Sequence, residues 1–571
     1  MKHSKLAILV SAAILASSSA YASSTNEATV GQSGNGNTAV VEQIVNSDNN
    51  DAFVTQTGDT NSATVIQSDT SDTVGSITQT GNLNQGTVLQ HDATQTATGT
   101  ITTTGNENIA FIEQQFNNGA GAAATVTQNG SNNDANILQD NGDSANSTIT
   151  QNGSGDIAVI DNHWSDFADA TITQAGGPGN NALIDQESSD AATAEITQTG
   201  AGNDGDIVQD TQNYGYSANA DDTVALLSQT GDNHRAYIKQ TGDSSDANVV
   251  QSGFSNQADV FQTGDNNEAD VMQSGDSDVA YIDQSGQDGL ASVTQAGNTG
   301  NSGTVMQSGF SNNGSVNQSG SSLTALVTQS DYDNVATVDQ SSTGNGATVT
   351  QSGSVAGMGN TADVDQHGDN DTATVMQSGD LNNATVMQHS SATSPWGSSF
   401  SNTVTIDQTG ASNTATAQSF SGANSTVDID QMGTSNVAWA ATYGDANTAT
   451  IYQDGSGNEA YALGWFDGGT ADANQLGNDN YGYAYAGSDG SSVDIDQVGD
   501  LNNATGESYG AGDDITISQT GNGHNATALA SDFYTGVDGN NTISITQTDM
   551  NNTANVTAMG YGNMATVTQG M

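Results

Sequence analysis

The chain has 571 residues, of which 33% are hydrophobic and 5% aromatic, and its formal net charge is −60 at pH 7. So few apolar residues cannot fill several ordinary cores, and composition alone would indicate disorder. The charge excludes nucleic-acid binding, because lysine and arginine, which contact phosphates, are almost absent. There is no cysteine, so disulfides are excluded as well.

The N-terminal segment, residues 1–22, is typical of a signal peptide. Two lysines precede an apolar run from Leu6 to Ala16, and Ala20-Tyr-Ala22 is a small-residue cleavage site. A membrane-spanning helix needs about 20 apolar residues, which neither this run nor any later stretch supplies. The sequence therefore predicts a secreted, extracellular protein with no membrane insertion.

From about residue 26 onward, glutamine recurs at short and regular intervals, with steps of eleven residues between Gln229 and Gln284. The glutamines that define the repeat most clearly are Gln56, Gln67, Gln229, Gln240, Gln251, Gln262, Gln273, Gln284, Gln366, Gln377 and Gln388. Glycines that stand two places after such a glutamine include Gly58, Gly231, Gly242, Gly264 and Gly275. Self-similarity at a fixed period is the mark of a repeat architecture.

Each interval predicts one strand and one tight turn. Ala269, Val271 and Gln273 stand at alternate positions, so all three lie on one face of a strand. The residues after each glutamine are turn formers, since glycine accepts a positive φ and Asp and Asn bond to nearby backbone. Two intervals close a coil of about 22 residues, so the fold is expected to be all-β, a β-solenoid of about 24 stacked two-strand coils.

Stacked coils also predict ladders of side chains. Each inward glutamine amide would bond to the glutamines above and below it, and asparagine at the turn would do the same. Thr103 and Asn162 occupy positions where the spacing calls for glutamine. We expect the ends of the stack to be uncapped strand edges, which are templates for another chain.

Two regions depart from the regular spacing. The gaps from Gln209 to Gln229 and from Gln388 to Gln408 each hold either a coil with a degenerate second strand or a surface loop. From about Gln431 onward glutamine recurs mainly at every second interval, and the other strand carries Tyr, Ala and Gly. We therefore divide the mature chain into residues 23–430, with glutamine on both strands, and residues 431–571, with glutamine on one.

The sequence indicates no catalytic, cofactor or metal site, and hence no enzyme. The seven histidines are scattered, and none belongs to a His-Glu-x-x-His pattern. His367 and His389 each follow a repeat glutamine, a position typical of a solvated turn.

The pattern Gln-x-Gly-x-x-Asn-x-Ala-x-x-x-Gln resembles the curlin repeat of curli subunits, the extracellular amyloid fibres of bacterial biofilms. Residues 32–43, 56–67, 262–273 and 377–388 match it at every position. The resemblance implies a structural, self-assembling fibre subunit that mediates adhesion and aggregation. Its partners would be copies of itself, a curli-type nucleator and a curli-type secretion pore. The chain is far longer than the usual major subunit and lacks a Gly-rich export segment, which leaves its role as major subunit or nucleator open.

The alternative hypothesis is a monomeric solenoid that binds ice or Ca²⁺ as a surface adhesin. Outward threonine pairs would form a flat array of hydroxyl and methyl groups, although threonine is also simply favourable on exposed strands. These pairs are Thr125/Thr127, Thr148/Thr150 and Thr171/Thr173. Turn aspartates such as Asp243, Asp265 and Asp276 are the candidates for divalent cations.

Overall fold

The computed structural model describes residues 25–570, except positions 45, 93, 143, 298 and 354 and segments 118–120, 211–221, 390–399 and 531–538. The predicted signal peptide lies outside the described residues. Every regular element in the described part is a strand. Nothing there forms a helix suited to crossing a membrane. The chain divides into two compact units, Met1–Gln273 and Ser274–Met571.

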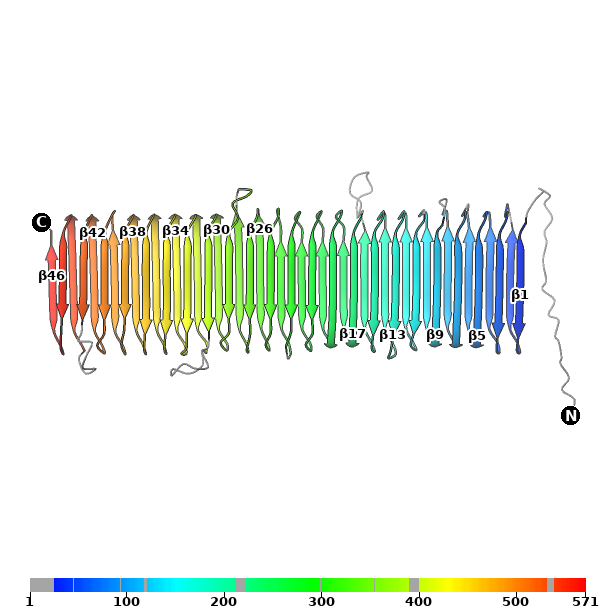
Figure 1. Ribbon diagram of the computed structural model, residues 1–571, viewed down its shortest axis with the longest axis horizontal. Coiled ribbons are helices and arrows are strands. Elements are labelled where there is room, and N and C mark those ends of the chain that lie inside the picture. Colours follow the sequence, from blue (N-terminus) through cyan, green and yellow to red (C-terminus); the bar gives the residue numbers. More distant parts are fainter. Residues whose placement is uncertain are drawn as a thin grey trace, which may run out of the picture. The chain divides into compact units, whose positions relative to one another are not determined.

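In the first unit, odd-numbered and even-numbered strands form two separate parallel sheets (Figure 1). The odd strands are β1 Glu27–Ser33, β3 Asp51–Thr57, β5 Val74–Asn82, β7 Thr98–Asn106, β9 Ala123–Ser131, β11 Asn146–Asn152, β13 Asp169–Ala175, β15 Thr193–Thr199, β17 Val224–Asp232, β19 Asp246–Phe254 and β21 Glu268–Gln273. The even strands are β2 Thr38–Ile44, β4 Ser62–Ser68, β6 Gln85–His91, β8 Ile109–Gln115, β10 Asp134–Asp140, β12 Ile157–His163, β14 Asn181–Glu187, β16 Asp204–Asp210, β18 Arg235–Gln240 and β20 Gln257–Gln262.

The second unit repeats this arrangement. Its even strands are β22 Val279–Gln284, β24 Ser302–Gln307, β26 Thr324–Asp331, β28 Gly346–Gly353, β30 Thr372–Asp380, β32 Thr403–Ala411, β34 Thr426–Thr434, β36 Thr448–Ser456, β38 Thr470–Asn478, β40 Ser492–Val498, β42 Asp514–Asn522, β44 Thr542–Met550 and β46 Met564–Gln569. Its odd strands are β23 Leu290–Gln295, β25 Asn313–Gln318, β27 Val335–Gln340, β29 Thr361–Gln366, β31 Asn383–His389, β33 Thr414–Phe420, β35 Val437–Tyr443, β37 Glu459–Trp465, β39 Tyr481–Ala486, β41 Asn503–Ser508, β43 Asn525–Ala530 and β45 Thr553–Ala558.

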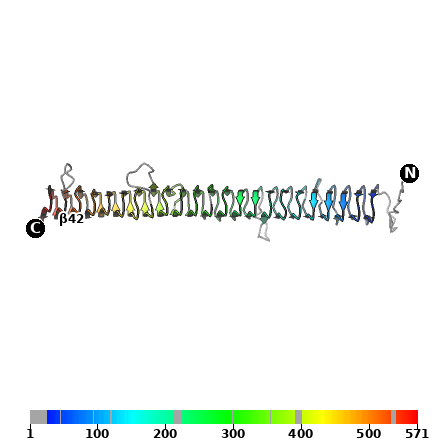
Figure 2. The same cartoon turned by 90° about the horizontal axis from the view of Figure 1, so that it is seen from below.

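The strands of neighbouring coils pair in parallel, and residues at the same position of the repeat lie opposite one another. Strand β17 pairs with β19 so that Ala225 lies opposite Ala247 and Gln229 opposite Gln251. Figure 2 shows the strands of each unit in two layers. The described residues form 46 strands, two to a coil, close to the predicted 24 coils. The predicted all-β solenoid is therefore confirmed.

The core is thin and built from small residues. In β21 the burial alternates along the strand, with Ala269, Val271 and Gln273 inside and their neighbours exposed. Every coil buries this inward row against the coils before and after it, so no thick apolar core is needed. A chain that is only 33% hydrophobic can therefore form this fold over its described residues.

The described strands keep their pairing register on either side of the two long gaps in the glutamine spacing. Residues 211–221 and 390–399, on which both interpretations fall, lie outside the described residues. Among the described strands, β15 pairs with β17 and β30 pairs with β32. Gln198 lies opposite Gln229, and Gln377 lies opposite Gln408.

The turn glycines are required chiefly because the turns stack closely. Gly58 and Gly231 have φ of 113° and 124°, as predicted, but Gly242, Gly264 and Gly275 do not occupy the left-handed region. A Cβ added to Gly242 would lie 2.0 Å from the carbonyl oxygen of Gly264 in the next coil. At Gly242 glycine is therefore selected by the space that the next turn leaves, and not by a positive φ.

The left-handed backbone falls two residues later, on side chains that the sequence did not single out. Ser244, Asn266 and Ser277 have φ of 53°, 56° and 60°. These values lie in the small left-handed region, which Asn and other small polar residues enter at modest cost. In these three turns the left-handed residue is therefore not glycine.

Candidate functional site

The inward glutamines form hydrogen-bonded ladders that run from coil to coil in each sheet. Gln251 on β19 is fully buried. Its Nε2 donates to Oε1 of Gln273 at 2.8 Å and to the carbonyl oxygen of Arg235 at 3.0 Å. Its Oε1 accepts from Nε2 of Gln229 at 2.9 Å. Both amide hydrogens and the oxygen are thus satisfied, two of the bonds by the same residue type one coil away.

All the glutamines singled out from the sequence are buried members of such ladders. In the first unit, Gln56, Gln229, Gln251 and Gln273 belong to the odd sheet, and Gln67, Gln240 and Gln262 to the even sheet. In the second unit, Gln366 and Gln388 belong to the odd sheet, and Gln284 and Gln377 to the even sheet. Their Nε2 to Oε1 distances are 2.7 to 2.9 Å.

The ladders contain gaps where another residue replaces glutamine. Thr103 lies opposite Gln79, and Asn162 lies opposite Gln139, as the spacing indicated. Thr103 Oγ1 and the Oε1 of Gln128 on the next coil find no hydrogen-bond partner among the described residues. A buried polar atom without a partner costs about 1–3 kcal/mol, so this position weakens the stack locally.

Replacing Thr103 by glutamine should repair the odd ladder of the first unit. A glutamine there would bond to Gln79 and Gln128, and each hydrogen bond adds about 1 kcal/mol. We expect Thr103→Gln to slow amide hydrogen exchange in β5, β7 and β9 by roughly 5- to 30-fold, which corresponds to 1–2 kcal/mol. Thr104→Gln, at the adjacent exposed position, should change nothing. Faster exchange in Thr103→Gln would contradict the ladder.

Asparagines at the turns form a second type of ladder that uses the backbone. Oδ1 of Asn61 accepts from the backbone N–H of Asn84 at 3.0 Å. Nδ2 of Asn84 then donates to the carbonyl oxygen of Gly105 at 2.9 Å. The predicted turn ladder exists, but most of its bonds link a side chain to the backbone of the next coil.

Histidine replaces asparagine in this ladder at two buried positions. The Nδ1 of His234 accepts from the backbone N–H of Asn256 at 3.3 Å, and its Nε2 donates to the carbonyl oxygen of Thr230 at 3.2 Å. His524 makes the equivalent bonds to Asn552 and Thr520. These partners require the neutral ring with its proton on Nε2, which places an acceptor and a donor where the amide of asparagine would have them.

The odd ladder of the second unit ends before the even one. Gln388 lies opposite Ser419, and Ser419 opposite Thr442, whose hydroxyl donates to Ser419 at 3.2 Å. In the even sheet glutamine continues from Gln284 to Gln569. The loss of one ladder that the sequence indicates therefore begins at β33, and the division at residue 430 stays a prediction.

Outward carboxylates stand close together because the coils are in register. Burial raises the pKa of Asp185 to about 6, and the neighbouring negative charge of Asp161 adds to the rise. Burial likewise raises the pKa of Asp494 to about 6, with a further contribution from Asp496. Unfolding would relieve this repulsion, so these groups oppose folding at neutral pH.

Mild acid should therefore stabilise the protein. The carboxyl groups of Asp185 and Asp494 have a pKa of about 6 in the folded protein, compared with an ordinary value of 3.8. The folded state therefore binds protons more tightly than the unfolded state, and the protein gains stability as the pH falls through about 6. We expect a higher urea midpoint at pH 5 than at pH 7. The double variant Asp185→Asn/Asp494→Asn should be more stable than the parent at pH 7 and depend less on pH. A urea midpoint that is lower at pH 5 than at pH 7 would contradict this prediction.

One cluster of possible metal ligands occurs in the part of the chain that the structure describes. The side chains of Asp365, His367 and His389 bring one ligand atom each within 4.8 Å of one another. His367 lies in the turn after β29 and is 40% exposed, as the sequence indicated, whereas His389 is the last residue of β31. Both histidines also form ion pairs with Asp365, which the sequence did not indicate. The missed signal was the separation of the two histidines along the sequence, which equals one coil.

These features define the class of the molecule as a two-sheet parallel β-solenoid held together by amide ladders. Eight segments match the curlin associated repeat, namely residues 242–273, 264–297, 299–330, 357–389, 401–433, 422–455, 444–464 and 488–521. Between residues 242 and 521 the chain is therefore built from repeats of the curlin-repeat family. No individual curated protein matches the sequence.

Proposed function

We propose that the chain is a secreted, self-assembling subunit of curli-like amyloid fibres, which mediates adhesion and aggregation in an extracellular biofilm matrix. The observation that supports this most is the ladder around Gln251, where two of the three side-chain bonds are made by identical residues one coil away. A second copy that docks in the same register offers the same bonds. Intramolecular coil stacking and fibre growth would then use one kind of contact.

The outermost described strands offer edges for this contact. Strand β1 pairs with β3, and its Val30 is 37% exposed although the position is buried in later coils. Strand β46 pairs with β44, and its inward Val567 and Gln569 are only partly covered. Unpaired strand edges are templates for further strands. Copies of the chain are thus the first proposed partner, and a curli-type nucleator and secretion pore are proposed from the family.

Assembly of the purified protein tests this proposal. At high ionic strength, which screens the acidic surface, the protein should form fibres that bind amyloid dyes. The fibres should diffract at about 4.8 Å along the axis and about 10 Å between sheets. A protein that stays monomeric for days under these conditions would refute self-assembly.

Ice binding is a second candidate, supported by one regular surface. Thr100, Thr125, Thr148 and Thr171 align across four consecutive odd strands, and a second threonine two residues later aligns in the same way. The array stops at Glu195, which lies opposite Thr171. A thermal-hysteresis assay decides this candidate, since an ice-binding face gives activity that Thr148→Glu abolishes.

Calcium binding by turn aspartates has weaker support. Oδ1 of Asp265 accepts from the backbone N–H of Asp243 at 3.1 Å, so this carboxylate bridges two turns. Ca²⁺ prefers six to eight oxygen ligands, far more than adjacent turns bring together at this point. Calorimetry with Ca²⁺ should therefore show no saturable site at these residues.

A further inference from the structure

The register of the odd sheet brings three ligating side chains to one point in the second unit. Asp365 and His367 are two residues apart, so both project from the same face at the end of β29. His389 ends β31 on the next coil, and the backbone N–H of His367 donates to the carbonyl oxygen of Gln388 at 2.7 Å. The two imidazoles are therefore neighbours across one coil step, with ring centroids 4.9 Å apart.

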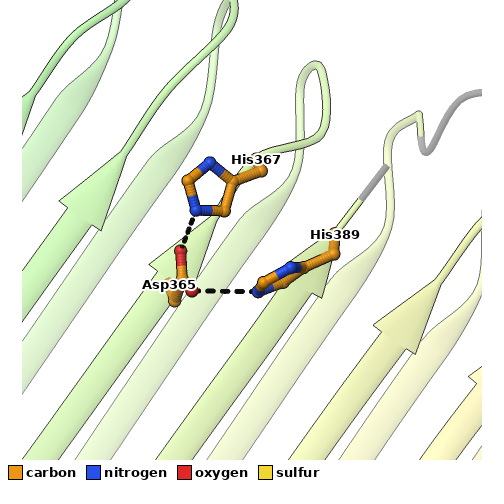
Figure 3. A group of neighbouring side chains, drawn as sticks. All are labelled: Asp365, His367 and His389. Atoms are coloured by element: carbon orange, nitrogen blue, oxygen red, sulfur yellow. Dashed lines mark hydrogen bonds and ion pairs between the residues drawn. The ribbon is translucent and has the colours of Figure 1, made fainter. Parts of the chain in front are cut away.

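Both imidazoles direct the same nitrogen at one carboxylate (Figure 3). His367 Nε2 lies 2.6 Å from Oδ1 of Asp365, and His389 Nε2 lies 2.9 Å from Oδ2. Burial alone would raise the pKa of Asp365, but the bond from His389 and the charges of both rings lower it. The bond to Asp365 raises the pKa of His389. The cluster thus places the Nε2 atoms of two imidazole rings against the two oxygens of one carboxylate.

We propose that Asp365, His367 and His389 bind a divalent transition-metal ion such as Zn²⁺, with a fourth position left to water. Two imidazole nitrogens and one carboxylate are an established ligand set for such ions. Bonds of about 2.0–2.2 Å in tetrahedral geometry place ligand atoms about 3.3 Å apart. The three atoms already lie within 4.8 Å of one another, so small side-chain rotations create the site. The side chains are 30–40% exposed, which leaves room both for these rotations and for water.

Ser341 supports the site from the preceding coil. Its Oγ is in hydrogen-bonding contact with Nδ1 of His367. When that nitrogen carries the proton and donates it to Ser341, Nε2 is left free of hydrogen and can ligate a metal. An outer partner of this kind fixes the orientation of a ligating histidine and is worth about 10- to 100-fold in affinity.

His91 is a histidine that also contacts two carboxylates but does not bring the ligand atoms to one point. His91 also contacts two carboxylates, at 2.6 Å through Nδ1 to Asp92 and at 2.8 Å through Nε2 to Glu113. Its two partners lie on opposite ring nitrogens, so their ligand atoms do not converge. His91 is therefore a matched control for an acid-paired histidine without a metal site.

Zn²⁺ calorimetry on the purified full chain tests the proposal, with excess Mg²⁺ to occupy weak carboxylate sites. The parent and His91→Ala should each bind one more tight Zn²⁺ than His367→Ala/His389→Ala. Asp365→Asn, which preserves side-chain shape, should weaken this site more than about 10-fold, and Ser341→Ala about 10- to 100-fold. With Cu²⁺ as the probe, electron paramagnetic resonance should report two imidazole nitrogens in the parent and one in His389→Ala. Equal Zn²⁺ stoichiometry in the parent and the double variant would overturn the proposal.

Discussion

Gln251→Glu should open the first unit locally more than any outward substitution. A carboxylate at this position loses both donated hydrogen bonds and faces the acceptor oxygens of Gln273 and Arg235. An uncompensated buried charge costs about 3–5 kcal/mol. We expect amide hydrogen exchange in β17, β19 and β21 to accelerate by roughly two to four orders of magnitude, as that free energy implies.

The outward neighbour provides the matched control. Val250 lies next to Gln251 on the same strand, and Ser228 and Met272 stand opposite it, so no acidic side chain is directly across. Val250→Glu introduces the same charge at a half-buried outward position that solvent reaches, and should change exchange less than about tenfold. Similar acceleration in both variants would mean that net charge, rather than the ladder, sets the stability.

Gly231→Ala should be nearly as disruptive for a steric reason. The backbone has φ of 124°, and an added Cβ would lie 2.1 Å from the carbonyl oxygen of Gly253. Backbone strain of this kind costs about 1–3 kcal/mol, and the clash with the next turn adds to it. We expect exchange at the turn and in β17 and β19 to accelerate by at least about 100-fold.

Two other glycines separate strain from contact. Gly155 has φ of 71° and no atom within 4 Å of an added Cβ, so Gly155→Ala should cost only the left-handed penalty of about 1–2 kcal/mol. Gly31 has equally open space without a positive φ, so Gly31→Ala should be close to neutral. If Gly231→Ala costs no more than Gly155→Ala, close stacking of the turns is not what selects glycine.

The coil, its two strands and its inward glutamines could be predicted because all three depend on one short period. The alternation of Ala269, Val271 and Gln273 already specifies the buried face. Stacking then follows, because the same residue type recurs at the same place in every coil. The substitutions at Thr103 and Asn162 were also found from spacing alone, since register is conserved across the break.

What could not be predicted depends on contacts between coils rather than on the period within one. The reason for glycine at Gly242 is the carbonyl oxygen of Gly264, one coil further on, which local turn rules do not include. Two further features require the three-dimensional turn: the bond from the Asn84 side chain to the carbonyl oxygen of Gly105 on the next coil, and the replacement of a turn asparagine by His234. The convergence of His367 and His389 was accessible from their spacing, but only once one coil was taken as the unit.

Distances between spin labels along one column of residues test the stacking most directly. Asp283, Asp407 and Tyr452 occupy equivalent outward positions of the even sheet, and successive register pairs join them through five and then two further coil steps. The chain has no cysteine, so cysteines introduced in pairs can be labelled selectively. Coils spaced by about 4.8 Å predict about 24 Å between positions 283 and 407 and about 34 Å between 283 and 452. Distances that fail to grow by about 10 Å between these two pairs would contradict the stacked, in-register solenoid.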